Sequence, residues 1–132
     1  MTVPSLLGIQ YDGGASHTRG PAAAPPRIRR ALATSAGNAW SERGRNVQDE
    51  LRDAGDIVVA PDANPRPRIT QAVGELMDAG HRPLVLGGDH SVTHPVLRAV
   101  GSRHPAVTIL HLDAHPDLYP SFGGDPHSHA CP

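Results

Sequence analysis

The chain has 132 residues, a formal net charge of −1 and few aromatic side chains, which suits one ordinary domain with a modest core. The balanced charge, with Arg as the only basic residue type besides His, argues against nucleic acid or an anionic membrane surface as a partner. Cys131 is the one cysteine, so no disulfide framework is expected and a reducing, cytoplasmic compartment is favoured. The N-terminal residues do not resemble a signal peptide, and no apolar stretch has the length of a membrane span.

The first half of the chain is predicted to alternate strands with helical and irregular segments. We expect a strand over residues 3–10, a Gly- and Pro-rich loop over 11–26 and a helix over 25–36. A polar irregular segment over residues 37–46 and a second strand over 56–60 should follow. A helix is then expected over residues 64–80, because apolar side chains recur there at helical spacing and Gly80 follows them.

The second half repeats the alternation. A short apolar run over residues 82–88 predicts a strand covered on both faces, and a helix over residues 91–103 is expected to begin with Ser91 as its N-cap. Residues 106–112 predict another buried strand, in which His111 would be a packed core histidine, and the remainder reads as loop. Strands that alternate with helices at this spacing predict an α/β fold with a parallel sheet.

Polar side chains gather where two of these strands end. "GGDH" follows the strand over residues 82–88, and "DAHPD" follows the strand over residues 106–112. Ligands of parallel sheets bind beyond the carboxyl ends of the strands, so both motifs are expected at one edge. Nine histidines are present, seven of them from His90 onward, which concentrates possible metal ligands in the same region.

Asp113, His115 and Asp117 stand at alternate positions. In an extended chain such side chains lie about 7 Å apart, too far for one ion with ligand distances of about 2 Å. The segment is therefore expected to curl, and two ions would suit a shared Asp113, with His115 serving one ion and Asp117 the other. His90, at the end of the neighbouring strand, strengthens this interpretation. Mn²⁺ fits the mixed imidazole and carboxylate ligands, and Zn²⁺ or Co²⁺ are alternatives; a polar loop whose Asp side chains cap backbone amides is the non-functional alternative.

Further histidines admit other interpretations. "HSVTH", from His90 to His94, lacks the Glu of zinc-protease helices. "DPHSHACP" at residues 125–132 is either a flexible tail or the source of an acid–base histidine near the metals.

"LVLGGDHS" followed by "LHLDAHPD" resembles the metal signatures of the ureohydrolases, the arginase and agmatinase family, and "YDGGASHTRGPAAAPPRIRRAL" is similar to the N-terminal region of agmatinase-like members. The resemblance implies a three-layer α/β/α sandwich with a mainly parallel sheet, and hydrolysis of a guanidinium carbon with two Mn²⁺ ions. It implies that His90 and Asp117 ligate the first ion, His115 ligates the second and Asp113 bridges them. "SHA" at residues 128–130 makes His129 the expected proton-transferring residue, with His127 as the alternative.

The family's second metal signature, a pair of Asp residues on a later strand, has no counterpart here. We therefore interpret residues 1–132 as the N-terminal portion of a single ureohydrolase domain whose C-terminal part is absent. The expected function is agmatinase-like release of urea from a small guanidino substrate, by a protein that is a homo-oligomer when full length. The alternatives are a non-catalytic truncated fragment with residual metal binding and, less well matched, a histone-deacetylase-like hydrolase.

Overall fold

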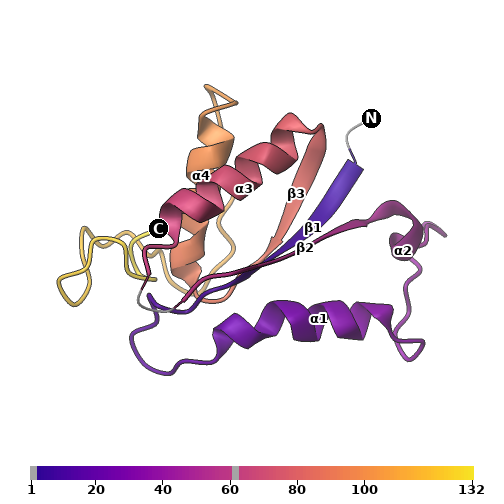
Figure 1. Cartoon of the computed structure of the whole chain (residues 1–132), viewed down its shortest axis with the longest axis horizontal. Coiled ribbons are helices and arrows are strands. Elements are labelled where there is room, and N and C mark those ends of the chain that lie inside the picture. The colour runs from indigo at the N-terminus through magenta and orange to yellow at the C-terminus, as the bar shows by residue number, and fades with distance from the viewer. Residues whose placement is uncertain (1–2, 61–62) are drawn as a thin grey trace.

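A computed structural model describes residues 3–60 and 63–132, and its centre is a parallel sheet (Figure 1). The three strands are β1 (Val3–Gln10), β2 (Arg52–Val58) and β3 (His81–Leu86). The α-helices are α1 (Ala24–Ala33), α2 (Val47–Glu50), α3 (Arg66–Asp78) and α4 (Thr93–Gly101). Two short 3-10 helices, η1 (Pro21–Ala23) and η2 (His90–Val92), lead into α1 and α4.

The sheet has the strand order β2-β1-β3, with both neighbours parallel to β1. β3 runs in register with β1 from the Val3–His81 pair to the Gly8–Leu86 pair, whereas the β1–β2 register shifts between Leu6 and Gly8. Because β1 is central, its side chains are buried on both faces, and this burial accounts for its continuous apolar sequence.

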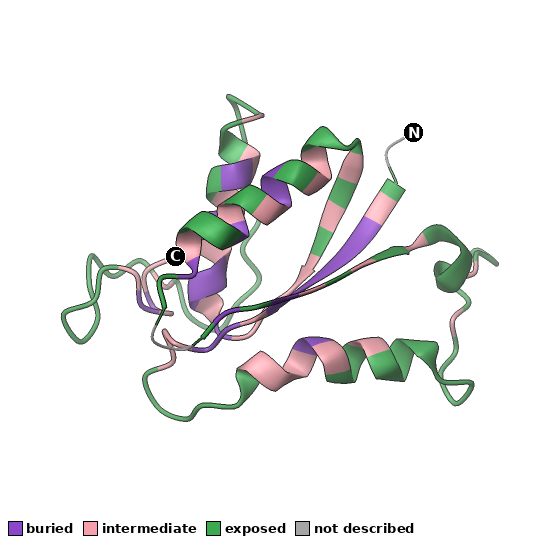
Figure 2. Cartoon of the chain, in the orientation of Figure 1, coloured by how far each residue is buried: buried purple, intermediate pink, exposed green. Residues whose placement is uncertain are grey.

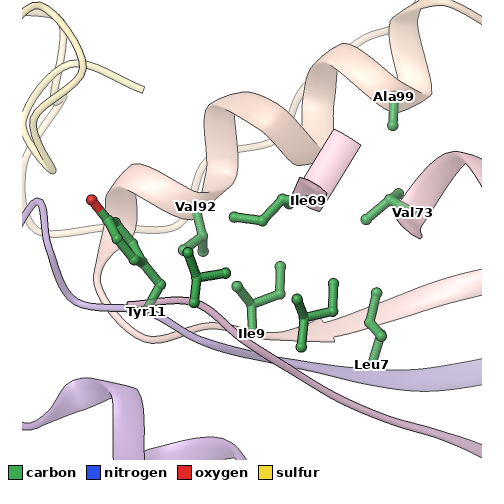
Figure 3. Close-up of a cluster of buried hydrophobic side chains, with 9 residues drawn as sticks. Leu7, Ile9, Tyr11, Ile69, Val73, Val92 and Ala99 are labelled. Carbon is green, nitrogen blue, oxygen red and sulfur yellow. The ribbon is translucent and has the colours of Figure 1, made fainter. Parts of the chain in front are cut away.

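Helices cover both faces of the sheet, with α1 on one side and α3 and α4 on the other (Figure 1). This is the three-layer α/β/α arrangement that the resemblance implies. The main core lies between the sheet and the α3–α4 pair, where Ile9 of β1 meets Ile69 and Val73 of α3, all with no exposed surface (Figure 3). Tyr11 and Val92 extend this core toward the carboxyl edge of the sheet (Figure 3).

The strand expected over residues 106–112 does not form, and that prediction is wrong for the described chain. These residues have no strand pairing, and their apolar side chains are exposed, up to 86% at Leu112 (Figure 2). A parallel strand of this apolar character requires cover on both faces. The described residues provide no such cover for this segment, so the run does not enter the sheet.

Candidate functional site

The first part of the site follows β3. The chain leaves the strand at Leu86, turns through Gly87 and Gly88, and reaches His90 at the start of η2. A Cβ at Gly88 would overlap the carbonyl of Tyr11, so only glycine permits the backbone to pass so closely here. The Asp89 amide donates a hydrogen bond of 3.1 Å to that same Tyr11 carbonyl, which anchors the turn to the end of β1.

The cap of this turn is Asp89, and the prediction of Ser91 as the N-cap is wrong. The Asp89 carboxylate accepts hydrogen bonds from the Ser91 amide at 2.8 Å and from the Ser91 hydroxyl at 2.5 Å. A carboxylate accepts at two oxygens and complements the positive end of the helical turn. The cap therefore sits two residues earlier than the sequence pattern indicated, and His90 falls in the first turn.

The second part of the site is the segment over residues 111–117, which curls as expected. Asp117 has a φ of 47°, the left-handed conformation, and it is the single non-glycine with positive φ among the described residues. Asp113 Oδ1 accepts a hydrogen bond of 2.9 Å from the His115 amide, which tightens the bend between them. This bond is the main cause of the lowered pKa of Asp113, and the nearby imidazoles of His111 and His90 lower it further. Asp113 is therefore held as a carboxylate.

Four side chains from these two parts converge. His90, His111, Asp113 and Asp117 each offer a ligand atom, and these atoms all lie within 4.8 Å of one another. His90 Nε2 is 3.6 Å from Asp117 Oδ2, and His111 Nε2 is 3.7 Å from Asp113 Oδ2. Two imidazoles and two carboxylates form a donor set that suits a divalent transition metal.

His90 shows that this donor set fits a metal ion. Its Nε2 is buried and has no hydrogen-bond partner among the described residues, a condition that ordinarily costs about 1–3 kcal/mol. Its other nitrogen, Nδ1, lies 3.0 Å from the Thr93 hydroxyl. A proton on Nδ1 that is donated to this hydroxyl leaves the lone pair of Nε2 available for a cation, as is usual for metal-ligating histidines.

His115 lies outside the four-residue cluster. Its side chain is 78% exposed, and its Nδ1 is 3.6 Å from Asp113 Oδ1. The two oxygens of Asp113 thus face different histidines, Oδ1 facing His115 and Oδ2 facing His111.

His111 is the residue that sequence reasoning missed. The apolar run predicts His111 as a core residue of a strand, but that strand does not form. The His111 ring lies instead against the His90 ring, with a centroid separation of 5.4 Å. Its position two residues before Asp113 was the available signal, because it extends the alternation of Asp113, His115 and Asp117 by one more step.

The two histidines near residue 128 have different surroundings. His129 is partly buried against the loop after β1, where its Nδ1 lies 3.0 Å from the Gly14 carbonyl and its Nε2 lies 3.3 Å from the Ser16 hydroxyl. His127 stacks on His94 of α4 with a centroid separation of 5.6 Å. Burial, followed by the proximity of His127, lowers the pKa of His94.

The sequence matches the arginase family over residues 4–132, and the chain belongs to that family. It is 43% identical to mitochondrial arginase 1 of Arabidopsis thaliana, in an alignment that covers 96% of this chain and 40% of the relative. It is 36% identical to an agmatinase of Bacillus anthracis, over 96% of this chain and 44% of the relative.

Solved structures show the same fold. Proclavaminate amidinohydrolase from Streptomyces clavuligerus superposes with a TM-score of 0.86 at 32% identity, over 99% of this chain and 44% of that structure. The chain thus spans about two fifths of the length of the curated arginases that it matches. Within residues 3–60 and 63–132, no helix is long and apolar enough to cross a membrane.

Proposed function

We propose that this chain contributes the first half of a binuclear manganese site to an agmatinase-like amidinohydrolase, which releases urea from a small guanidino compound. One observation carries the proposal: in a chain of the arginase family, the buried and unpartnered Nε2 of His90 lies among two carboxylates and a second imidazole. The names of the relatives support hydrolysis at an amidine or guanidine carbon, since they include arginase, agmatinase and proclavaminate amidinohydrolase.

Each ligand has a proposed place. His90 and Asp117, which lie 3.6 Å apart, hold the first ion, and Asp113 bridges because its two oxygens face different histidines. His115, whose exposed ring lies 3.6 Å from Asp113 Oδ1, would hold the second ion. His111 is an additional candidate on the Oδ2 side of Asp113. When bound, two divalent cations would lower the pKa of a bound water, so that hydroxide would be available near neutral pH.

His129 is the proposed proton-transferring residue. Hydrolysis forms a bond from the water oxygen to the guanidinium carbon and breaks a bond from that carbon to the nitrogen that carries the substrate's tail. The departing amine must gain a proton, and an imidazole can deliver one near neutral pH. Of the two candidates, His129 is favoured over His127, because both of its ring nitrogens already contact polar groups of the loop after β1.

Two further properties belong to the same proposal. We place the protein in the cytoplasm, since Cys131 is a free thiol and a reducing compartment suits it. We expect a homo-oligomer of the full-length protein that acts on a small guanidino substrate.

A second candidate function is metal binding without catalysis. The observation that favours it is that the described residues form one cluster of four ligands, which is enough for a single ion. Two divalent ions would bring four positive charges, against two negative charges from Asp113 and Asp117. A site with that imbalance binds a second ion poorly.

Urea release in the presence of Mn²⁺ distinguishes these functions. In the full-length protein, the wild type and an Asp49→Asn variant, which changes an exposed carboxylate on α2, are expected to release urea from agmatine or arginine, whereas Asp113→Asn is not. Equal urea release by the wild type and Asp113→Asn would refute the bridging role. Bound Mn²⁺ without urea release from any chain would favour the non-catalytic function.

A further inference from the structure

The loop after β1 connects the metal-ligand turn to the proposed proton-transferring histidine through one residue, Gly14. We propose that Asp89 and Gly14 form a positioning unit that holds the Nδ1 proton of His129 on the Gly14 carbonyl and thereby presents Nε2 as the acid–base nitrogen. The inference rests on the proposed function only for the role of His129 in proton transfer. The hydrogen-bond chain itself is independent of that role.

Asp89 supplies the fixed end of this unit. The residue is buried, with 8% of its surface exposed, and its Oδ2 accepts a hydrogen bond of 2.8 Å from the Gly14 amide. Its Oδ1 is occupied by Ser91, and its own amide is bonded to Tyr11. Both carboxylate oxygens and the backbone amide of Asp89 are therefore hydrogen-bonded. These bonds fix the carboxylate that accepts from the Gly14 amide.

The carbonyl of Gly14 then faces His129. It accepts a hydrogen bond from the His129 amide at 3.4 Å and lies 3.0 Å from His129 Nδ1. A carbonyl oxygen can only accept, so a proton must sit on Nδ1 for this contact to be favourable. The Ser128 hydroxyl, 3.1 Å from the same nitrogen, could instead donate to a bare Nδ1. That arrangement would set the Nδ1 lone pair against the Gly14 oxygen, so the carbonyl decides the tautomer.

The opposite nitrogen is left with its lone pair. His129 Nε2 lies 3.3 Å from the Ser16 hydroxyl, which can rotate to donate to it or turn aside. In the neutral ring, Nε2 is therefore the nitrogen that accepts a proton, and in the charged ring it is the one that releases a proton. Gly14 and Ser16 belong to the same loop, so one short segment contacts both ring nitrogens of His129.

Glycine is required at position 14 for the unit to close. A Cβ there would lie 2.6 Å from the Ser91 hydroxyl oxygen and 2.7 Å from Ser91 Cβ, with Asp89 Oδ1 at 3.1 Å. Contacts this short would push the loop away from Asp89. The Gly14 carbonyl would then withdraw from His129, although the substitution adds only a methyl group.

The tautomer of His129 can be read directly by NMR of the full 132-residue chain labelled with ¹⁵N-histidine, without metal or substrate. At a pH where His129 is neutral, the wild type is expected to show Nδ1 protonated and Nε2 bare. Gly14→Ala is expected to lose this preference and give a mixture of tautomers. Gly101→Ala is the matched control, because a Cβ at that position meets nothing within 4 Å, and it should retain the wild-type signals.

Asp89→Asn is a second, isosteric variant in case Gly14→Ala fails to fold. The Gly14 and Ser91 amides donate to different oxygens of Asp89, and asparagine replaces one of these oxygens with a donor, so one of the two bonds is lost and the preference should again weaken. A wild-type ring protonated on Nε2, or an unchanged tautomer in a folded Gly14→Ala or Asp89→Asn chain, would overturn the proposal. Because the readout needs neither metal nor turnover, failure of the urea assay would leave this result intact, and the reverse also holds.

Discussion

Replacement of Thr93 by Val tests the hydrogen bond between the Thr93 hydroxyl and the His90 ring. Thr93 Oγ1 lies 3.0 Å from His90 Nδ1, while the opposite nitrogen of the ring is buried and faces the other ligands. Val keeps the branched shape of Thr and has a similar helix propensity, so α4 should be retained. The change removes the hydroxyl that holds the ring and its Nδ1 proton.

Loss of such a supporting hydrogen bond to a metal-ligating histidine typically weakens metal affinity by about 10–100-fold. This range corresponds to about 1.4–2.7 kcal/mol of binding free energy. Because the Thr93 hydroxyl is the one hydrogen-bond partner of the His90 ring among the described residues, we expect an effect inside this range.

Competition of Mn²⁺ between the protein and a fluorescent chelator measures this difference at equilibrium. Thr93→Ser keeps the hydroxyl and should bind within about threefold of the wild type, well short of the loss expected for a missing supporting hydrogen bond. Equal Mn²⁺ affinity in Thr93→Val and the wild type would show that this hydrogen bond does not support metal binding by His90. Equal weakening in Thr93→Ser and Thr93→Val would show that the loss of affinity does not come from the missing hydroxyl.

The fold yields further predictions. Ile69→Ala, at a fully buried position, should lower the free energy of unfolding by about 2–5 kcal/mol in urea titrations followed by circular dichroism. Leu112→Ala, at a position 86% exposed, should change it by less than about 0.5 kcal/mol, and comparable losses in the two variants would contradict the described core. The lowered pKa of His94 means that the unfolded chain binds this proton more readily than the folded chain as the pH falls below the ordinary value of 6.5. Stability should therefore be full above that value and decline below it. His94→Phe should flatten the decline between pH 7 and pH 5, and an unchanged slope would rule out His94 as its source.

The alternation of strands with helices and the parallel sheet were predictable from local sequence patterns, whereas the three layers were implied by the resemblance to the ureohydrolases. The continuous apolar run of β1 and the helical spacing of Ile69 and Val73 each indicate burial, and the structure confirms it. The predicted cover on both faces of the strand over residues 82–88 is wrong, because β3 is an edge strand of the described sheet and its Leu84 is 51% exposed. The meeting of "GGDH" and "DAHPD" was expected from a parallel connection of two strands. The two motifs do meet, since His90 approaches Asp117, although the second strand does not form.

The details of the site were less accessible. An apolar run such as residues 106–112 signals a buried strand, but pairing and cover depend on other parts of the chain, which no local pattern reveals. Because His111 was expected inside that strand, its position in the cluster of four possible metal ligands was not predicted. The role of Gly14 was also invisible, because it depends on contacts with Asp89 and His129 that lie 75 and 115 residues away in sequence.

The proposed function requires that His90, Asp113 and Asp117 bind a divalent metal ion at this edge of the sheet. Electron paramagnetic resonance of Mn²⁺ titrated into the chain tests it most directly, since bound and free Mn²⁺ give different signals. We predict at least one bound Mn²⁺ per wild-type chain, the same for His104→Gln at an exposed position outside the cluster, and loss of the bound signal in His90→Gln and Asp117→Asn. Binding that is absent from the folded wild type, or equal in all four chains, would contradict the account.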